Sequence, residues 1–279
     1  MTSSYVPRLV ILDSNSASPV AESPGDAEVE EWHDKDGNVV GHAFASDGTH
    51  VVELDGVARF TVNAGSAEVT ALPAPGVAES LVAEYFRRWI LPVAAQIGGL
   101  EVLHASAVVS PTGVVAFAAA SEAGKSTIAY GLAGRGYETW TDDALAFDVL
   151  AGAPHAFPLP FRLRLRAASA THFGLEPATG GTIAGESEAA GDPRPIATVF
   201  LLERKPSGPP VEIERVDPLE AFPTLVERSY HFGSEDSERK RAMVSRYLEL
   251  ATAVPVYRLN MATGLEHLSA VLHAVEGSL

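Results

Sequence analysis

The first part of the chain alternates between apolar and polar residues in short runs. Stretches rich in Asp, Gly, Asn and Ser separate these runs, which span residues 28–34, 39–45, 49–55, 57–64 and 67–74. Alternation with a period of two is typical of strands that bury one face, and such turn residues favour hairpins. The pattern predicts a small antiparallel sheet within residues 1–75, and from it a small N-terminal β domain over residues 1–78.

The pattern changes to that of a helix after residue 78. Apolar side chains recur at helical spacing between residues 79 and 97, at Leu81, Val82, Tyr85, Phe86, Trp89 and Ile90. One face of this helix is therefore expected to be buried. Gly98 and Gly99 follow and are expected to end it. We take the helix as the start of a second, larger domain over residues 79–279.

Nearly continuous apolar runs come next, at residues 101–109 and 113–120. Such runs are typical of strands buried on both faces, as in the centre of an α/β sheet. Residues 125–136 then predict a helix, and residues 137–143 predict another strand. Because a strand, a loop, a helix and a strand in this order form a βαβ-like unit, the predicted fold class is α/β.

The C-terminal half continues with mixed elements. Residues 196–205 and 255–261 predict strands, and residues 217–232, 237–254 and 264–278 predict helices. Residues 174–195 are rich in Gly, Ala and Glu, so we expect a mobile loop there that serves as a substrate lid.

Composition and charge exclude several functions. The chain has 36 acidic residues against 20 Lys and Arg, a formal charge of −16, so we expect it to bind neither nucleic acid nor an anionic membrane surface. It has no cysteine, which excludes disulfides and thiolate chemistry. The N-terminal sequence lacks the basic and apolar regions of a signal peptide, and Arg87 and Arg88 interrupt the most apolar helix. A cytoplasmic protein is expected.

The stretch "AAASEAGKST" at residues 118–127 carries the first chemical motif. It lies between a predicted buried strand and a predicted helix, where free backbone N–H groups and the helix dipole favour phosphate. Lys125 is expected to reach the β- and γ-phosphates of a nucleotide, and the Ser126 hydroxyl to hold Mg²⁺. The residues expected to contact the nucleotide are Ser121, Glu122, Ala123, Gly124, Lys125, Ser126 and Thr127.

Two residues of this loop depart from the pattern G-x-x-x-x-G-K-[ST]. Ala119 stands where the first glycine is expected, and a backbone conformation that suits glycine would strain it. Glu122 adds a negative charge next to the phosphates unless its side chain points outward or meets a metal or a base. An ordinary helix start with an exposed lysine is the alternative interpretation of the motif.

Asp142 and Asp143 follow the next predicted strand. Two adjacent carboxylates can divide two tasks, one holding Mg²⁺ while the other accepts the proton of an attacking hydroxyl. The alternative is an Asp pair that caps a turn or a helix. His104 lies in the strand before the loop, where it either packs in the core or lines the phosphate site.

The order of these motifs over residues 103–148 resembles the catalytic domain of HPr kinase/phosphorylase. The resemblance rests on the His104 strand, a second strand, the phosphate loop, a helix, the Arg135-Gly136 turn and the Asp pair. It implies an HPr-kinase/PEP-carboxykinase-like P-loop core with a mixed central sheet. The N-terminal sheet and "LHASAV" at 103–108 are more similar to HPr-kinase-related proteins of peptide natural-product pathways, some of which phosphorylate a serine of a lasso-peptide precursor.

The resemblance also implies roles for individual residues. Asp142 would be the base that activates a serine hydroxyl, and Asp143 with Ser126 would bind Mg²⁺. His104 would lie near the transferred phosphate and Lys125 on the nucleotide. The expected cofactors are therefore ATP and Mg²⁺.

Three arginines at a period of two, Arg162, Arg164 and Arg166, are a further candidate for anion binding. On a strand all three would face one side, which suits a nucleotide phosphate or an acidic substrate, and Arg162 is the best placed. The alternative is a solvated strand face.

The sequence thus predicts an ATP-dependent kinase that phosphorylates a Ser or Thr hydroxyl of a peptide or protein, with a natural-product precursor as one candidate. Two alternatives remain open. One is a kinase of a small hydroxylated metabolite, and the other is a degenerate nucleotide-binding partner without catalysis. A homo-oligomer is compatible with each of them.

Overall fold

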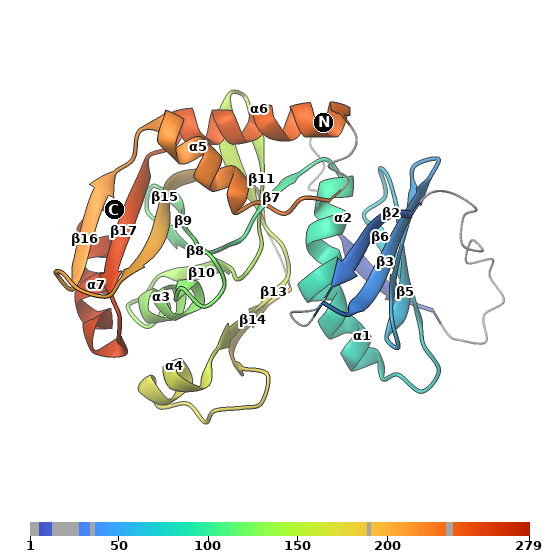
Figure 1. Cartoon of the computed structure of the whole chain (residues 1–279), viewed down its shortest axis with the longest axis horizontal. Helices are drawn as coiled ribbons and strands as arrows, with labels where there is room; N and C mark the ends of the chain where they lie inside the picture. The colour runs from blue at the N-terminus through green and yellow to red at the C-terminus, as the bar shows by residue number, and fades with distance from the viewer. Residues whose placement is uncertain (1–5, 13–27, 34–36, 189–190, 233–236) are drawn as a thin grey trace. The chain divides into compact units, whose positions relative to one another are not determined.

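The computed structural model describes residues 6–12, 28–33, 37–188, 191–232 and 237–279 (Figure 1). The chain divides into two compact units. The first contains Met1–Leu100 and His231–Arg241, and the second contains Glu101–Tyr230 and Ala242–Leu279. The predicted boundary between residues 78 and 79 falls inside the first of these units.

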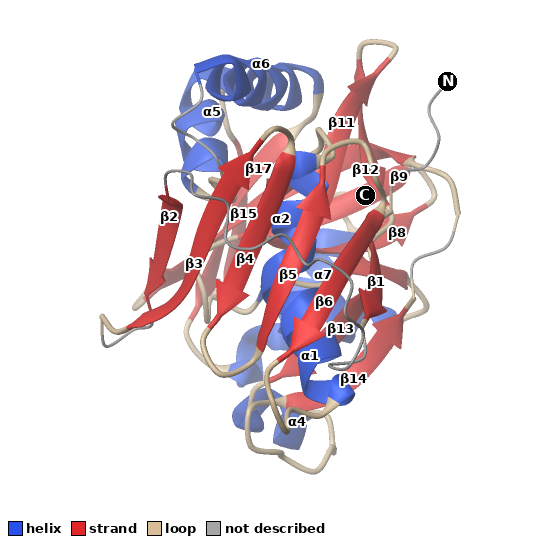
Figure 2. Cartoon of the chain, turned by 90° about the vertical axis from the view of Figure 1, so that its right-hand side faces the viewer, coloured by secondary structure: helices blue, strands red, loops and turns tan. Residues whose placement is uncertain are grey.

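The alternating runs of the N-terminal part form one sheet in the order β1-β6-β5-β4-β3-β2 (Figure 2). Its described strands are β1 (Arg8–Ile11), β2 (Glu28–His33), β3 (Val39–Ser46), β4 (Thr49–Leu54), β5 (Ala58–Asn63) and β6 (Glu68–Pro73). Neighbouring strands from β2 to β6 are antiparallel, as predicted, whereas β1 pairs with β6 in parallel. The alternation holds within β5, where Ala58, Phe60 and Val62 are buried.

The helix predicted at 79–97 is continuous but changes its winding. It consists of α1 (Glu79–Tyr85), a π-helical turn η1 (Phe86–Ile90) and α2 (Leu91–Ile97). Pro92 directly follows the π-helical turn, and because it has no N–H it cannot donate to the turn before it. The helix contacts the N-terminal sheet, where α1 contacts β6 and α2 contacts β5. Because its apolar face packs there, the helix belongs to the first unit.

A mixed sheet forms the centre of the second unit, which is therefore of the α/β class, as predicted. Its strand order in the described residues is β10-β8-β9-β15-β12-β11-β7, with β17 pairing β15 and β16. The strands are β7 (Glu101–Leu103), β8 (Ala105–Ser110), β9 (Gly113–Ala118), β10 (Glu138–Thr141), β11 (Leu145–Leu150), β12 (Ala153–Phe157), β15 (Arg194–Lys205), β16 (Val211–Arg215) and β17 (Val256–Ala262).

Helices cover both faces of this sheet (Figure 1). On one face, α5 (Pro218–Glu227) and α6 (Ser237–Ala253) pack on the side chains of Val114 and Ala116. On the other face, α3 (Lys125–Ala133) and α7 (Leu268–Glu276) pack on Val115 and Phe117. Since every residue of β9 is buried, this strand has no solvated face, which explains its unbroken apolar sequence.

A smaller two-stranded sheet lies in the region predicted as a mobile loop. Strand β14 (Thr182–Ser187) pairs antiparallel with β13 (Phe161–Leu165), and β15 already begins at Arg194. The prediction of a loop over 174–195 is therefore wrong for these segments. The Gly- and Glu-containing sequence has a low strand propensity. Pairing with β13 nevertheless stabilises it as a strand, because strand formation depends more on the neighbouring strand than on intrinsic propensity. The short helix α4 (Ala167–His172) follows β13.

None of the helices in the described part of the chain combines the length and apolar character needed to cross a lipid bilayer.

Candidate functional site

The register of the central sheet brings three sequence motifs to one edge. Strand β8 runs antiparallel to both of its neighbours, so that Ala105 pairs with Ala118 at the end of β9 and Ala107 with Thr141 at the end of β10. The segment before β8 and the segments after β9 and β10 therefore meet. In α/β sheets, this edge at the carboxyl ends of the parallel strands is where ligands bind.

The loop between β9 and α3 contains two residues with a positive φ. Gly124 caps α3 with a φ of 109°, and Glu122 has a φ of 71°. A left-handed conformation costs a residue with a Cβ about 1–2 kcal/mol. Glu122 is therefore strained at a position that would suit glycine. Ala119 does not have a positive φ, and its methyl group is buried in the core. The expected strain at Ala119 is therefore absent.

Lys125 is almost completely buried at the start of α3, with 5% of its surface exposed. Its Nζ donates to the carbonyl oxygens of Ala119 and Ala120, at 3.2 and 3.3 Å. Burial lowers the pKa of this ammonium group, and the nearby Asp143 and Asp142 carboxylates oppose that shift. The lysine side chain thus folds back onto the loop, where two backbone carbonyl oxygens accept from its ammonium group.

Asp142 is buried under the loop and holds several donors. Its Oδ1 accepts from Ser106 Oγ at 2.5 Å, its Oδ2 accepts from the backbone N–H of Arg164 at 3.1 Å, and Ser126 also donates to it. Burial and the neighbouring Asp143 charge raise its pKa to about 6, although these donors favour the carboxylate. The two motifs of the sequence, the loop serine and the Asp pair, therefore lie side by side.

Asp143 is oriented differently from its neighbour. Its backbone has a φ of 64°, and 54% of its side chain is exposed. The Oδ1 atom lies 3.7 Å from Nε2 of His104, a half-buried residue between β7 and β8 whose ring meets the Tyr230 ring edge-on. The left-handed backbone turns the two adjacent carboxylates apart, one inward and one toward solvent.

The side chain of Glu122 points away from the loop and is paired. Its Oε1 lies 2.7 Å from Nη2 of Arg166, and both side chains are largely exposed. Arg166 occupies the position just before α4, directly after β13. The ion pair thus links the phosphate loop to the two-stranded β13–β14 sheet.

Arg162 and Arg164 of β13 and Arg166 directly after it have different contacts. Phe161, Leu163 and Leu165 are buried and the arginines between them are not, so the predicted alternation is observed. Arg162 Nε donates to Glu186 on the neighbouring strand at 3.0 Å, whereas Arg164 contributes its backbone to Asp142. Arg166 meets the loop through its ion pair with Glu122.

Sequence reasoning overlooked four residues of this region: Ser106, Arg166 as a loop contact, Arg204 and Arg228. Ser106 follows His104 by two positions, so the period of a strand was a signal that it faces the same way. Arg204 Nε donates to the Ala123 carbonyl at 3.1 Å from the end of β15. No local pattern identifies these long-range contacts of arginine.

Arg228 lies at the C-terminal end of α5, close to the site. Its carbonyl accepts from the backbone N–H of His104 at 2.8 Å, and Ser229 bridges to Leu103. Its positive charge contributes to lowering the pKa of Lys125, which places two cations near the loop. The Asp143 and Asp142 carboxylates act on the same lysine in the opposite direction and more strongly.

The described residues contain no cluster of three or more His, Asp or Glu side chains able to enclose a metal ion. Mg²⁺ does not need one, because it commonly binds through one or two carboxylates, water and substrate phosphates. Ser126, Asp142 and Asp143 match that type of site and do not match a protein-only cage.

Comparisons with known proteins add little to this geometry. No family model matches the chain. No curated protein matches it either. Among solved structures, it is similar to the Hpr(Ser) kinase/phosphatase from Coxiella burnetii, with 11% identity and a TM-score of 0.31. That match covers 63% of this chain and 89% of the other.

Proposed function

We propose that this protein is an ATP-dependent phosphotransferase that moves the γ-phosphate of ATP to a Ser or Thr hydroxyl of a peptide or protein in the cytoplasm. The position of Ser126 beside Asp142, which also accepts from Ser106 Oγ and from the Arg164 N–H, is the observation that carries the proposal most directly. It joins the phosphate loop to the acidic pair, as a nucleotide-dependent magnesium site requires. The motif order over residues 103–148, with its resemblance to HPr kinase/phosphorylase, supports the same conclusion.

The loop residues fit a polyphosphate. The Lys125 ammonium group donates to the backbone carbonyl oxygens of Ala119 and Ala120, and phosphate oxygens are stronger acceptors for it. The N–H groups at the start of α3 and the helix dipole add to the attraction. Arg228 contributes further positive charge near Lys125. These groups would orient the phosphates and offset their charge.

Magnesium would be held by Ser126 together with one carboxylate of the acidic pair. When bound, the ion supplies charge neutralisation on the phosphate oxygens. The remaining carboxylate is then available to accept the proton of the attacking hydroxyl.

The resemblance assigns the base to Asp142 and the metal to Asp143. The raised pKa of Asp142, about 6, supports a role as proton acceptor near neutral pH. A second division of roles is favoured by the bond between Ser126 and Asp142, since the loop serine and its carboxylate partner commonly share the metal. In that case Asp143, exposed and beside His104, is the proton acceptor.

Phosphate transfer from ATP labelled at the γ-position to a pool of Ser- and Thr-containing peptides tests the proposal. Wild type should label peptides in the presence of Mg²⁺, and Asp192→Asn, at an exposed turn, should do the same. The variant that lacks the base should bind Mg-ATP normally but transfer about 10²–10⁴-fold more slowly. The variant that lacks the metal ligand should instead need much more Mg²⁺.

Comparing Asp142→Asn with Asp143→Asn therefore separates the two divisions of roles. If small hydroxylated metabolites are labelled but no peptide is, the phosphate acceptor is a metabolite and not a peptide or protein. Absence of transfer to any acceptor, with ATP bound, would leave a nucleotide-binding partner protein and contradict the proposal.

A further inference from the structure

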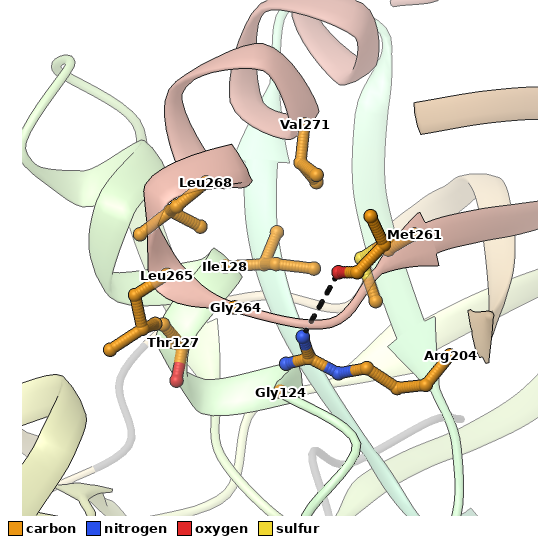
Figure 3. Close-up of a pocket in the computed structure, with 10 residues that line it drawn as sticks. Gly124, Thr127, Ile128, Arg204, Met261, Gly264, Leu265, Leu268 and Val271 are labelled. Carbon is orange, nitrogen blue, oxygen red and sulfur yellow. Dashed lines mark hydrogen bonds between the residues drawn. The ribbon is translucent and has the colours of Figure 1, made fainter. Parts of the chain in front are cut away.

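A pocket lies beside the phosphate loop, on the side of α3 that faces the end of β17 (Figure 3). It is small and partly open to solvent. Its apolar wall consists of Ile128, Met261, Leu265, Leu268 and Val271. These residues come from α3, from β17 and from the η2 (Leu265–His267) and α7 helices that follow it.

The pocket is continuous with the loop that we propose holds phosphate. Gly124 and Thr127, both within the nucleotide motif, line its other side. A ligand whose phosphates lie on the loop can therefore extend into the pocket without crossing the core. Gly264, with a φ of 118°, turns the chain from β17 into η2 and thereby forms the rim.

Arg204 lies at the mouth of the pocket next to Gly124 (Figure 3). Its Nε donates to Ala123 at 3.1 Å and its Nη1 donates to Ala262 at 3.5 Å, so two backbone carbonyls fix the plane of the guanidinium group. A planar, delocalised cation of this kind stacks well on an aromatic ring. With an apolar wall opposite, the pocket offers two surfaces suited to a flat heterocycle.

We infer that this pocket binds the aromatic base of the nucleotide, stacked against Arg204 and packed on Leu265 and Leu268. The inference rests on the proposed function, because it assumes that the phosphates lie on the loop. It adds the residues that make the protein a nucleoside triphosphate binder and not a binder of polyphosphate in general.

Photolabelling locates the base directly. The full-length protein is irradiated with 8-azido-ATP and Mg²⁺, and the modified peptide is identified by mass spectrometry. Attachment within residues 261–271 or at Arg204 is the expected result, and excess ATP should suppress it. Attachment confined to other parts of the chain, in a reaction that ATP still suppresses, would overturn the inference.

Binding measurements separate this inference from the proposed function. Wild type should bind ATP about fivefold or more tightly than tripolyphosphate, since stacking of a base is worth at least about that factor. Leu265→Trp, which fills the pocket, should bring ATP down to the affinity of tripolyphosphate and leave tripolyphosphate unchanged. Leu219→Trp, at a residue on α5 that is 82% exposed, is the matched control and should change neither affinity.

Equal affinities of wild type for ATP and tripolyphosphate would overturn the inference and leave the phosphate site intact. Binding of neither ligand would overturn the proposed function as well. Arg204→Gln provides a second variant at an exposed side chain, and it should lower the affinity for ATP alone.

Discussion

Glu122 and Arg166 form an ion pair, with Oε1 and Nη2 at 2.7 Å, at the point where the phosphate loop meets the β13–β14 sheet. Glu122 occupies a left-handed position, with a φ of 71°, where a glycine would be free of strain. The pair therefore explains how the loop tolerates an acidic residue there. Arg166 draws the carboxylate outward and offsets its charge.

Glu122→Gln should tighten ATP binding several-fold, because it removes a negative charge beside the phosphates and releases Arg166 toward them. Arg166→Gln should weaken ATP binding by a similar factor, since it leaves the carboxylate unpaired. Isothermal titration with Mg-ATP measures both. The double variant Glu122→Gln/Arg166→Gln should lie near wild type, and weaker binding by Glu122→Gln alone would contradict this explanation.

Glu122→Gly tests the strain separately from the charge. Stability should change little, because relief of about 1–2 kcal/mol at a left-handed residue is offset by the greater entropy of glycine in the unfolded chain and by loss of the exposed ion pair. Urea unfolding of this variant and of Glu122→Gln gives the comparison. A loss of more than about 3 kcal/mol in either would show that the loop depends on Glu122 for its fold.

Asp142 makes stability depend on pH. Its pKa in the folded protein, about 6, lies above the ordinary value of 3.8, so protonation favours the folded state. The contribution of this group is fully present below pH 4 and is lost as the pH rises through about 6. The loss is about 2–3 kcal/mol, since one pKa unit corresponds to about 1.4 kcal/mol.

Asp142→Asn should therefore be more stable than wild type at pH 8 by about that amount and similar to it at pH 4. Denaturant unfolding without nucleotide, at a series of pH values, measures the difference. Asp192→Asn, at an exposed turn, should follow the wild-type profile. A constant difference between Asp142→Asn and wild type at all pH values would contradict the raised pKa.

Gly124→Ala should weaken ATP binding for a steric reason. Gly124 has a φ of 109°, and an added Cβ would lie 2.8 Å from Nη2 of Arg204. The end of the arginine side chain can move, but it then leaves the Ala123 and Ala262 carbonyls. Both Gly124→Ala and Gly136→Ala should cost about 1–2 kcal/mol of stability, because both residues are left-handed.

Gly136 is the matched control, because it has a φ of 98° and no atom within 4 Å of an added Cβ. Its substitution should leave nucleotide affinity unchanged. Equal effects of the two substitutions on ATP binding would show that strain alone, without Arg204, explains the result.

The sequence predicted those parts of the site that local patterns determine. The buried strand β9, the helix after Gly124 and the Asp pair after β10 each follow from periodicity or from a short motif. The contacts of Ser106, Arg166 and Arg228 did not follow, because each joins residues far apart in the chain. Such contacts are set by strand order and register, and periodicity specifies neither.

The structure differs from the sequence-based predictions in two further places, again because strand pairing and packing partners are not encoded in a local pattern. Residues 182–187 have a composition typical of a loop, yet pairing with β13 makes them a strand. The helix at 79–97 has one apolar face, but the pattern cannot indicate which sheet covers it. Its partner in the structure is the N-terminal sheet.

Titration with Mg-ATP of wild type and of Lys125→Met tests directly whether the loop binds a nucleotide. Wild type should bind at submillimolar ATP, and Lys125→Met should bind about tenfold or more weakly, because the lysine would provide a buried, charge-assisted contact to phosphate. No binding to wild type at millimolar ATP, or equal binding by both proteins, would contradict nucleotide binding by the loop.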